Sequence, residues 1–149
     1  MKNLIQNFLV IAILLVIYSS AAAQGKYGVK GKIFPHEQAD SLFGKVTQSV
    51  QISTDELKGV LAKAKDYVFF TIKNNNAVIT NEKRESLIGN RVIPTQDEKM
   101  HFFSKSKITE LLQGTSSASV SIELRGTTLT VSTMESTMDL SSLCPPFCL

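Results

Sequence analysis

The chain of 149 residues has no tryptophan and only two histidines, His36 and His101. Neither histidine belongs to an H-E-x-x-H motif or to a pair at metal-ligand spacing. Zinc enzymes need such clusters, because three or four protein side chains must converge on the metal. The scarcity of histidine therefore argues against a zinc hydrolase. We expect His101 to lie on a strand and His36 to be exposed at the start of a short helix.

Motifs of nucleophilic catalysis and of phosphate binding are also absent. There is no G-x-S-x-G sequence and no P-loop. Residues 104–107 (SKSK) have the S-x-x-K spacing of penicillin-binding proteins, but the S-D-N and K-T-G motifs of those enzymes are missing. Asp55 and Glu56 are adjacent carboxylates, which suit the start of a helix. The sequence thus offers no catalytic residue, implies no cofactor and does not favour an enzyme.

The chain has no large excess of charge of either sign. Its formal charge is +3, from 16 basic and 13 acidic residues. Lys26, Lys30 and Lys32 form one short basic stretch, and the other lysines are scattered. Nucleic-acid-binding domains usually carry a clustered basic face. We therefore expect no nucleic-acid partner. The three lysines are interpreted as part of a solvated tail, with a membrane or cell-wall surface as the alternative.

No apolar run is long enough for a membrane-spanning helix. The longest, Phe8–Tyr18, has 11 residues, whereas a bilayer requires about 20. Lys2 precedes this run and Ala21–Ala23 follow it, which is the order of a secretory signal peptide cleaved before Gln24. An uncleaved anchor is the alternative. We expect residues 1–23, which resemble the Sec signals of Gram-negative bacteria, to be removed. The protein would then be periplasmic or secreted, without a membrane span.

The 126 residues after this leader are enough for one domain. In residues 24–34 glycine recurs at every third position, which predicts a flexible linker. We expect residues 35–143 to form the domain and residues 144–149 to form a short tail. Pro35–Phe43 is predicted to open the domain as a short helix that Gly44 ends.

A strand, a helix and two further strands are predicted within residues 46–81. Polar and apolar residues alternate over positions 46–52, as in a half-buried strand. Ser53 and Glu56 have the spacing of a capping box, and an apolar stripe follows them at helical intervals. Residues 67–80 then contain two strand-forming runs on either side of an asparagine-rich turn.

Residues 99–133 repeat this order of elements. A short strand ends at Phe103, Ser106 is expected to cap a helix, and Gly114 is expected to stop it. Residues 118–131 then hold an alternating strand, an Arg-Gly turn and a return strand.

The matching order predicts an internal duplication, with equivalent apolar positions 51 residues apart in the helices and 50 apart after them. We therefore predict an α+β fold in which two β-α-β-β units, 46–81 and 99–133, lie on an antiparallel sheet in a single domain. Coincidental similarity is the alternative, because few residue identities match.

Residues 82–98 join the two units and are long for a connection inside a compact domain. Their four aliphatic side chains predict that this linker docks on the body of the protein. We add the aromatic residue of the tail to them as a candidate surface for a partner. This surface consists of Leu87, Ile88, Val92, Ile93 and Phe147.

Both cysteines lie at the C-terminus, in the sequence Cys144-Pro145-Pro146-Phe147-Cys148. In an oxidising compartment an even pair this close predicts a disulfide between Cys144 and Cys148. The alternative is a metal or thiol-redox site. Met134 and Met138 would add two thioethers to the two thiols, and soft sulfur ligands select Cu(I).

The motif C-P-x-x-C also resembles the metal and redox motif of Sco-type copper chaperones. The resemblance covers residues 144–148 and implies copper binding or thiol chemistry at the two cysteines. Sco-type proteins carry the motif early in a thioredoxin-like fold, with a distant histidine ligand. Here the motif ends the chain, and no histidine can be matched to that ligand.

Export, a nearly neutral charge and the lack of a catalytic constellation favour a small non-catalytic binding or inhibitor-like module. Its partner would be a protein, peptide or glycan of the cell envelope. Tandem α+β repeats also occur in exported binding proteins such as the beta-lactamase inhibitor proteins, although a shared fold does not establish a shared function. The alternative is a copper or thiol-redox protein that uses Cys144 and Cys148.

Overall fold

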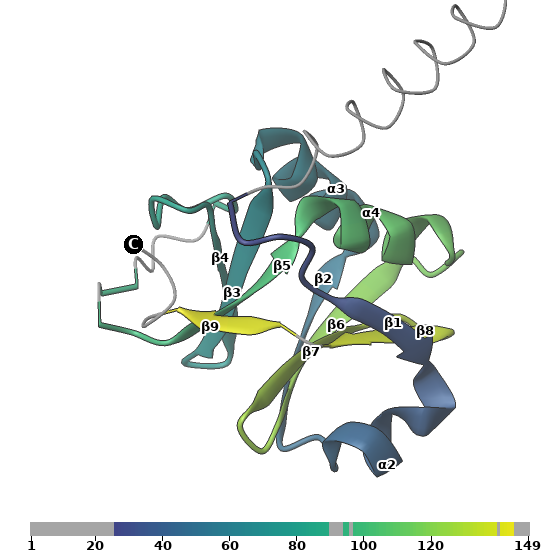
Figure 1. Cartoon of the computed structure of the whole chain (residues 1–149). Helices are drawn as coiled ribbons and strands as arrows, with labels where there is room; N and C mark the ends of the chain where they lie inside the picture. The colour runs from purple at the N-terminus through teal and green to yellow at the C-terminus, as the bar shows by residue number, and fades with distance from the viewer. Residues whose placement is uncertain (1–25, 90–93, 96, 140, 145–149) are drawn as a thin grey trace, which may run out of the picture.

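Figure 1 shows the computed structural model of the chain, which describes residues 26–89, 94–95, 97–139 and 141–144. Of residues 142–144 it describes the backbone. The described residues form a mixed α+β structure with two antiparallel sheets and three α-helices. The strands are β1 (Lys32–Pro35), β2 (Gln48–Ser53), β3 (Tyr67–Lys73), β4 (Asn76–Thr80), β5 (Met100–Ser104), β6 (Ser119–Arg125), β7 (Thr128–Ser132), β8 (Ser136–Asp139) and β9 (Ser142–Cys144).

Local chemistry accounts for the ends of the helices. Ser53 Oγ accepts a hydrogen bond from Glu56 N at 3.0 Å, so the predicted cap is confirmed. Gly44 ends the short helix with a φ of +84°, which glycine adopts at low cost. The helices are α2 (Ala39–Phe43), preceded by the 3-10 turn η1 (His36–Gln38), α3 (Thr54–Lys63) and α4 (Lys105–Gln113).

The prediction that Ser106 caps the second long helix is wrong. Helix α4 begins at Lys105, after Ser104 in an extended conformation. The hydroxyl of Ser104 accepts a hydrogen bond from Lys30 N at 2.7 Å, and Ser104 N donates to Lys30 O at 2.9 Å. Ser104 therefore ties the N-terminal segment to the start of α4, a role that its sequence neighbours do not reveal.

Two tight turns form the hairpins where the sequence predicts them. Between β3 and β4, Asn74 and Asn75 have φ values of +52° and +58°, which asparagine tolerates better than most residues. Between β6 and β7, Gly126 has a φ of +65°. Both turns match the right-handed twist of their strands and set the register of each hairpin.

The predicted units exchange their first strands. Strand β2 of the first unit pairs with β6 of the second, with Ile52 opposite Val120. Strand β5 of the second unit pairs with β3 of the first, with Phe103 opposite Val68. The strand orders are β1-β8-β7-β6-β2 and β4-β3-β5-β9. The sequence predicts an antiparallel sheet and leaves open whether the units form one sheet or two; the structure has two sheets, each built from strands of both units.

The main core lies between the two long helices and both sheets. Helix α3 contacts α4, β2 and β6, and α4 also contacts β1, β5 and β8. Figure 1 shows the two helices side by side at one end of the sheets. Leu57 of α3, Ile108 of α4, Phe70 of β3 and Ile122 of β6 are all completely buried in this core. The apolar stripes predicted for the two helices thus meet each other and the exchanged strands.

A second apolar cluster covers the other face of the four-stranded sheet. Tyr27, from the N-terminal segment, packs on this cluster, and its ring centroid is 5.4 Å from that of Tyr67. The Tyr67 hydroxyl donates a hydrogen bond to Gly28 O at 2.9 Å and accepts one from Tyr27 N at 2.8 Å. The cluster consists of Tyr67, Phe69, Val78, Met100 and Phe102.

These contacts correct the prediction of a flexible linker at residues 24–34. From Tyr27 onward the segment is docked on the body, and Lys32–Pro35 is a strand of the five-stranded sheet. Within this segment, Gly31 lies close to side chains of the core. A Cβ placed on Gly31 would lie 3.1 Å from the Sδ atom of Met138 and 3.2 Å from the ring of Phe103. This close approach, together with a φ of +106°, favours glycine at this position.

The linker between the units docks on the core, as predicted, through Leu87 and Ile88. Leu87 is buried, Ile88 packs against the same cluster, and Leu87 N donates to Ile79 O at 2.9 Å. Arg84 adds hydrogen bonds to the main-chain oxygens of Thr95 and Glu98. Among the described residues, no helix is long and apolar enough to cross a membrane.

Burial of His101 on β5 predicts a pH-dependent stability. Burial lowers the pKa of His101 to about 4, and its Nδ1 lies 2.9 Å from Ser141 Oγ. The unfolded chain therefore binds a proton more readily than the folded one below about pH 6.5. The stabilisation from neutral His101 is complete above that pH and is lost as the pH falls toward 4.

We expect the protein to lose about 2 kcal/mol of unfolding free energy between pH 7 and pH 5 through His101 alone. Urea unfolding at the two pH values measures this loss. The His101→Asn variant should lack it, whereas a matched His36→Asn variant should retain it. An equal pH dependence in the wild type and the His101→Asn variant would show that His101 is not the group responsible.

Candidate functional site

The outer face of the five-stranded sheet carries polar side chains that are nevertheless buried. They alternate along β6, β7 and β8 with the apolar side chains of the main core. The segment His36–Gly44, which we call the cover, contacts this face through His36, Asp40 and Gly44. We call the buried polar residues the polar layer: Glu123, Arg125, Thr130, Ser132 and Thr137.

Arg125 connects the polar layer to the cover. Its Nη1 donates to Asp40 Oδ1 at 2.6 Å and to Gly44 O at 2.8 Å, so one guanidinium holds both the side chain and the C-terminal end of α2. Its Nε and Nη2 donate to Glu123 Oε2 at 3.2 and 2.9 Å. The side chain of Arg125 is 2% exposed, whereas that of Asp40 is 67% exposed. The pair with Glu123 is therefore the buried part of this network.

The network keeps Arg125 charged. Burial by itself lowers the pKa of Arg125, but the hydrogen bonds and charges of Asp40 and Glu123 outweigh it and hold this pKa above its ordinary value. A buried guanidinium needs such partners, because an unpaired charge in the interior is very costly.

Glu123 is the centre of a longer hydrogen-bonded chain. Its Oε2 also accepts hydrogen bonds from Thr130 and Ser132, at 3.3 and 3.0 Å. Ser132 Oγ lies 3.1 Å from Thr137 Oγ1, which in turn lies 3.0 Å from His36 Nδ1. Across the described part of the chain, no buried side-chain nitrogen or oxygen lacks a hydrogen-bond partner. The layer is thus fully satisfied internally.

His36 differs from the exposed residue that the sequence predicts. It is half-buried, and its backbone nitrogen donates to Glu135 O at 3.0 Å. Glu123 and Arg125 are also buried, although strand alternation in the sequence assigns polar side chains to solvent. One feature of the sequence did indicate their burial: opposite charges two residues apart on a strand lie on the same face and can pair there.

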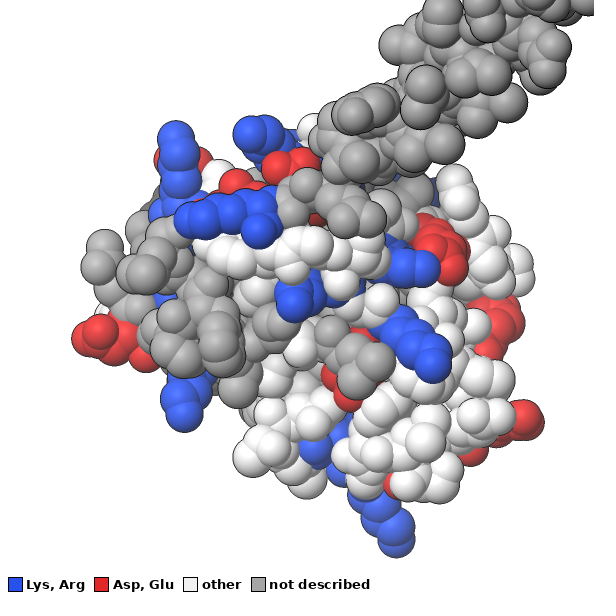
Figure 2. All heavy atoms as spheres, in the orientation of Figure 1, with Lys and Arg blue, Asp and Glu red and all other residues white. Residues whose placement is uncertain are grey.

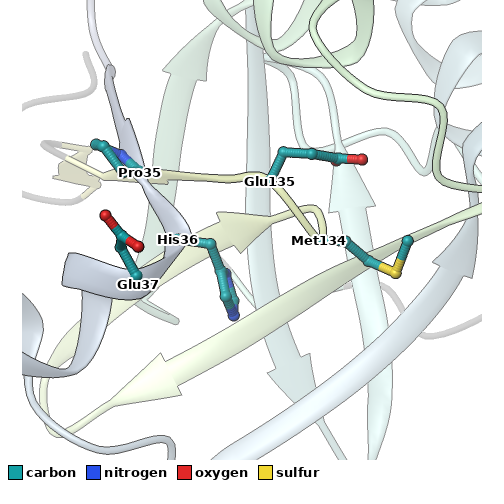
Figure 3. A pocket seen from close by; sticks show the side chains of 5 residues that line it. All are labelled: Pro35, His36, Glu37, Met134 and Glu135. Atoms are coloured by element: carbon teal, nitrogen blue, oxygen red, sulfur yellow. The ribbon is translucent and has the colours of Figure 1, made fainter.

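A pocket opens at the junction of the cover with the β7–β8 turn. It has a volume of about 410 Å³ and is lined by Pro35, His36, Glu37, Met134 and Glu135. Figure 3 shows that the first three come from the end of β1 and from η1, and that the other two come from the turn. A hydrogen bond of 2.5 Å from the Thr115 hydroxyl lowers the pKa of Glu135, which favours its charged form.

The geometry of this region does not provide a catalytic site. Thr137 lies beside a histidine, as a nucleophile would lie beside its base. However, Thr137 is completely buried and Ser132 nearly so, and a substrate cannot reach either hydroxyl. Among the described residues, no group of three or more His, Cys, Asp or Glu side chains is arranged to hold a metal ion.

The two methionines proposed as copper ligands do not converge. Met138 is completely buried in the main core on β8, opposite Val131. Met134 lies in the β7–β8 turn and is 74% exposed. Because Met138 packs inside the protein, it is not available to a metal site at the surface. The copper site that combines both thioethers with the two thiols is therefore not supported by their positions.

The cysteine tail lies mostly outside the described residues. The backbone of Cys144 belongs to β9 and stands opposite Met100 of β5. The side chain of Cys144 and the whole of Cys148 are outside the description, as are Val92, Ile93 and Phe147. The predicted disulfide and the thiol alternative remain predictions. Leu87 is buried in the core, so its side chain is not available to a partner, which corrects its place in the predicted partner surface.

The exposed large hydrophobic side chains gather near the cover. Among the described residues they are Val29, Leu42, Val46 and Met134. Leu42 lies on α2, Val46 follows it, and Met134 lines the pocket beside His36. Val29 belongs to the N-terminal segment. Three of these four side chains are thus part of the cover or close to it: Leu42 belongs to it, Val46 follows it, and Met134 lines the pocket beside it.

No protein-family model, no curated protein and no solved structure matches this chain.

Arg125 should contribute far more to stability than its exposed partner Asp40. Arg125→Met leaves Glu123 buried without a counter-charge, which should cost about 3–5 kcal/mol of unfolding free energy. Asp40→Asn removes an exposed partner and should cost at most about 1 kcal/mol. Urea unfolding measures both losses, and amide hydrogen exchange of residues 36–44 reports on the cover. Equal losses in the two variants would contradict this account of the network.

Proposed function

We propose that this protein is a small exported binding module without catalytic activity, and that it contacts its partner through the cover and the β7–β8 turn. The observation that carries the proposal is the contrast between the two sides of the cover. Beneath the cover, every buried polar side-chain group is hydrogen-bonded. On the outside, Leu42 and Met134 are 51% and 74% exposed.

A rigid cover suits recognition. Arg125 holds α2 at both its Asp40 side chain and its Gly44 carbonyl, so the backbone that carries Leu42 is held in place before a partner arrives. Fixing a binding surface in advance reduces the entropy lost on association. Charged side chains border these apolar ones: Glu37 and Glu135 line the pocket beside Met134, and Asp40 of α2 is 67% exposed. Figure 2 shows uncharged side chains around α2 and β8 with charged ones at their edge. Exposed apolar side chains with a charged rim favour a protein or peptide partner.

The proposed location outside the cytoplasm rests on the leader sequence. Residues 1–23 have the charge, apolar core and small-residue end of a signal peptide. The partner would then be a protein or peptide of the cell envelope, and the two cysteines would meet oxidising conditions.

Capture from an envelope extract tests the binding proposal. The immobilised protein should enrich a partner that the Leu42→Glu/Met134→Glu variant loses by at least tenfold, because charges on this surface oppose its burial. Val29→Glu is the matched control, since Val29 is 50% exposed but lies away from the cover. Enrichment that survives the double substitution, or that Val29→Glu abolishes equally, would remove the cover from the proposal.

We also propose that the two β-α-β-β units arose by internal duplication. The registers support it. With an offset of 51 residues for the first strands and 52 for the hairpins, the pair Ile52–Val120 corresponds to the pair Phe103–Val68. With the same offset of 52, Phe70–Ile79 of one hairpin corresponds to Ile122–Val131 of the other. The hairpin offset is 52, where the sequence predicted 50.

Reciprocal exchange implies that neither half folds alone. We expect residues 24–91 and 92–149, produced as separate chains, to be unfolded individually and to recover native circular dichroism when mixed. Val120→Asp in the second fragment should prevent recovery, because Val120 is buried opposite Ile52. Thr127→Asp, at an exposed turn, should not. A fragment that folds by itself would contradict the mutual dependence of the units.

A further inference from the structure

The N-terminal segment presents lysines and one apolar side chain on a fixed backbone. Within residues 26–32 there are three lysines, at positions 26, 30 and 32, and Val29 between them is 50% exposed. No other described segment of this length combines three lysines with an exposed large hydrophobic side chain. The sequence predicts a flexible tail here, and its lysines would then have no defined arrangement.

The structure holds this segment in place at both ends. Near its start, Tyr27 N and Gly28 O both bond to the hydroxyl of Tyr67. Further along, Lys30 N donates to the hydroxyl of Ser104, and Lys30 O accepts a hydrogen bond from Ser104 N. These contacts fix the backbone on both sides of Val29. The lysines and Val29 therefore form part of a surface and not a disordered tail.

Helix α4 adds further positive charge next to the segment. Lys105 directly follows Ser104, which is bonded to Lys30, and the Cβ atom of Lys107 lies 3.4 Å from the Cβ position built on Gly31. Figure 2 shows basic side chains along this side of the molecule, over the N-terminal segment and α4. The acidic residue nearest in α4 is Glu110, which pairs with Lys107 at 2.6 Å. Asp139 also stands opposite Lys32 in the pairing of β1 with β8, and Lys105 Nζ donates to Ala64 O at 2.9 Å. The five lysines of this surface thus stand against two acidic residues, which gives an excess of three positive charges.

We propose that this surface, formed by residues 26–32 and the start of α4, binds the surface of an anionic lipid bilayer. The lysines approach the headgroups, and Val29 enters the boundary between headgroups and acyl chains. Clustered lysines are attracted to anionic lipids, and each contributes about a fivefold increase in partitioning. An apolar side chain among them adds burial that a soluble polyanion does not offer.

The position of the segment in the chain favours a membrane over other polyanions. The apolar run Phe8–Tyr18 lies just upstream, and Lys26 follows the predicted cleavage position by three residues. A leader of this kind brings the segment to a membrane surface during export. This surface does not include the cover, so membrane binding can be absent while the proposed partner binds at the cover.

Co-sedimentation with vesicles tests the proposal. The protein is recovered from the exporting cell, and its first residue is determined by mass spectrometry. Binding is measured to phosphatidylcholine vesicles with and without phosphatidylglycerol, at low and high salt. We expect the protein to bind the anionic vesicles, and we expect salt to weaken this binding.

The variant Lys26→Gln/Lys30→Gln/Lys32→Gln should reduce binding to the anionic vesicles roughly 100-fold. A control with the same loss of charge elsewhere, Lys45→Gln/Lys83→Gln/Lys99→Gln, should reduce it much less.

Val29→Ser separates a lipid surface from a soluble polyanion. It should weaken vesicle binding several-fold and leave retention on a heparin column unchanged, because only the bilayer accepts an apolar side chain. Equal binding to neutral and anionic vesicles would overturn the proposal, as would equal losses in the two triple variants. Heparin retention without vesicle binding would also overturn it, in favour of a polysaccharide or another soluble polyanion.

Discussion

The exchange of first strands between the two β-α-β-β units is the constraint on which the rest of the structure depends. Strand β2 completes the sheet of the second hairpin, and β5 completes that of the first. Neither hairpin can bury both of its faces without the strand and helix of the other unit. The exchange also brings α3 and α4 together over one core. The linker of residues 82–98 joins β4 to β5 within the four-stranded sheet, where β3 lies between them, and it docks on the core through Leu87.

The outer face of the five-stranded sheet is stabilised in a different way from the main core. The main core occupies one face, and the other face carries opposite charges and hydroxyls on β6, β7 and β8. This face is stable in the interior because the groups satisfy one another, with Glu123 and Arg125 at the centre. Arg125 extends the same network to α2 and so converts a short helix, too short to be stable alone, into a fixed part of the surface. The result is a helix α2 whose backbone has a fixed position on the surface.

Much of the regular structure could be predicted from residues close in sequence. The Ser53 cap, the asparagine turn after β3, the glycine turn after β6 and the end of α2 at Gly44 each follow from local backbone preferences. The missed elements were β1, β8 and β9, all short strands at or near sheet edges. They carry little alternation of their own and are stabilised by partners far along the chain. Ser104 shows the same limit, because its hydroxyl binds Lys30 and not the helix that follows it.

The candidate site could not be predicted from residues that are neighbours in the sequence. By itself the sequence determined the element order, the two amphipathic helices, the hairpin turns and the absence of a catalytic motif, because each of these depends on neighbours within a few residues. Only the tertiary structure decided that Glu123 and Arg125 are buried, that Met138 is a core residue and that the N-terminal lysines have a fixed arrangement. Those outcomes depend on which strands pair across the chain, and a strand's two faces are distinguished only once its partners and its covering segment are in place.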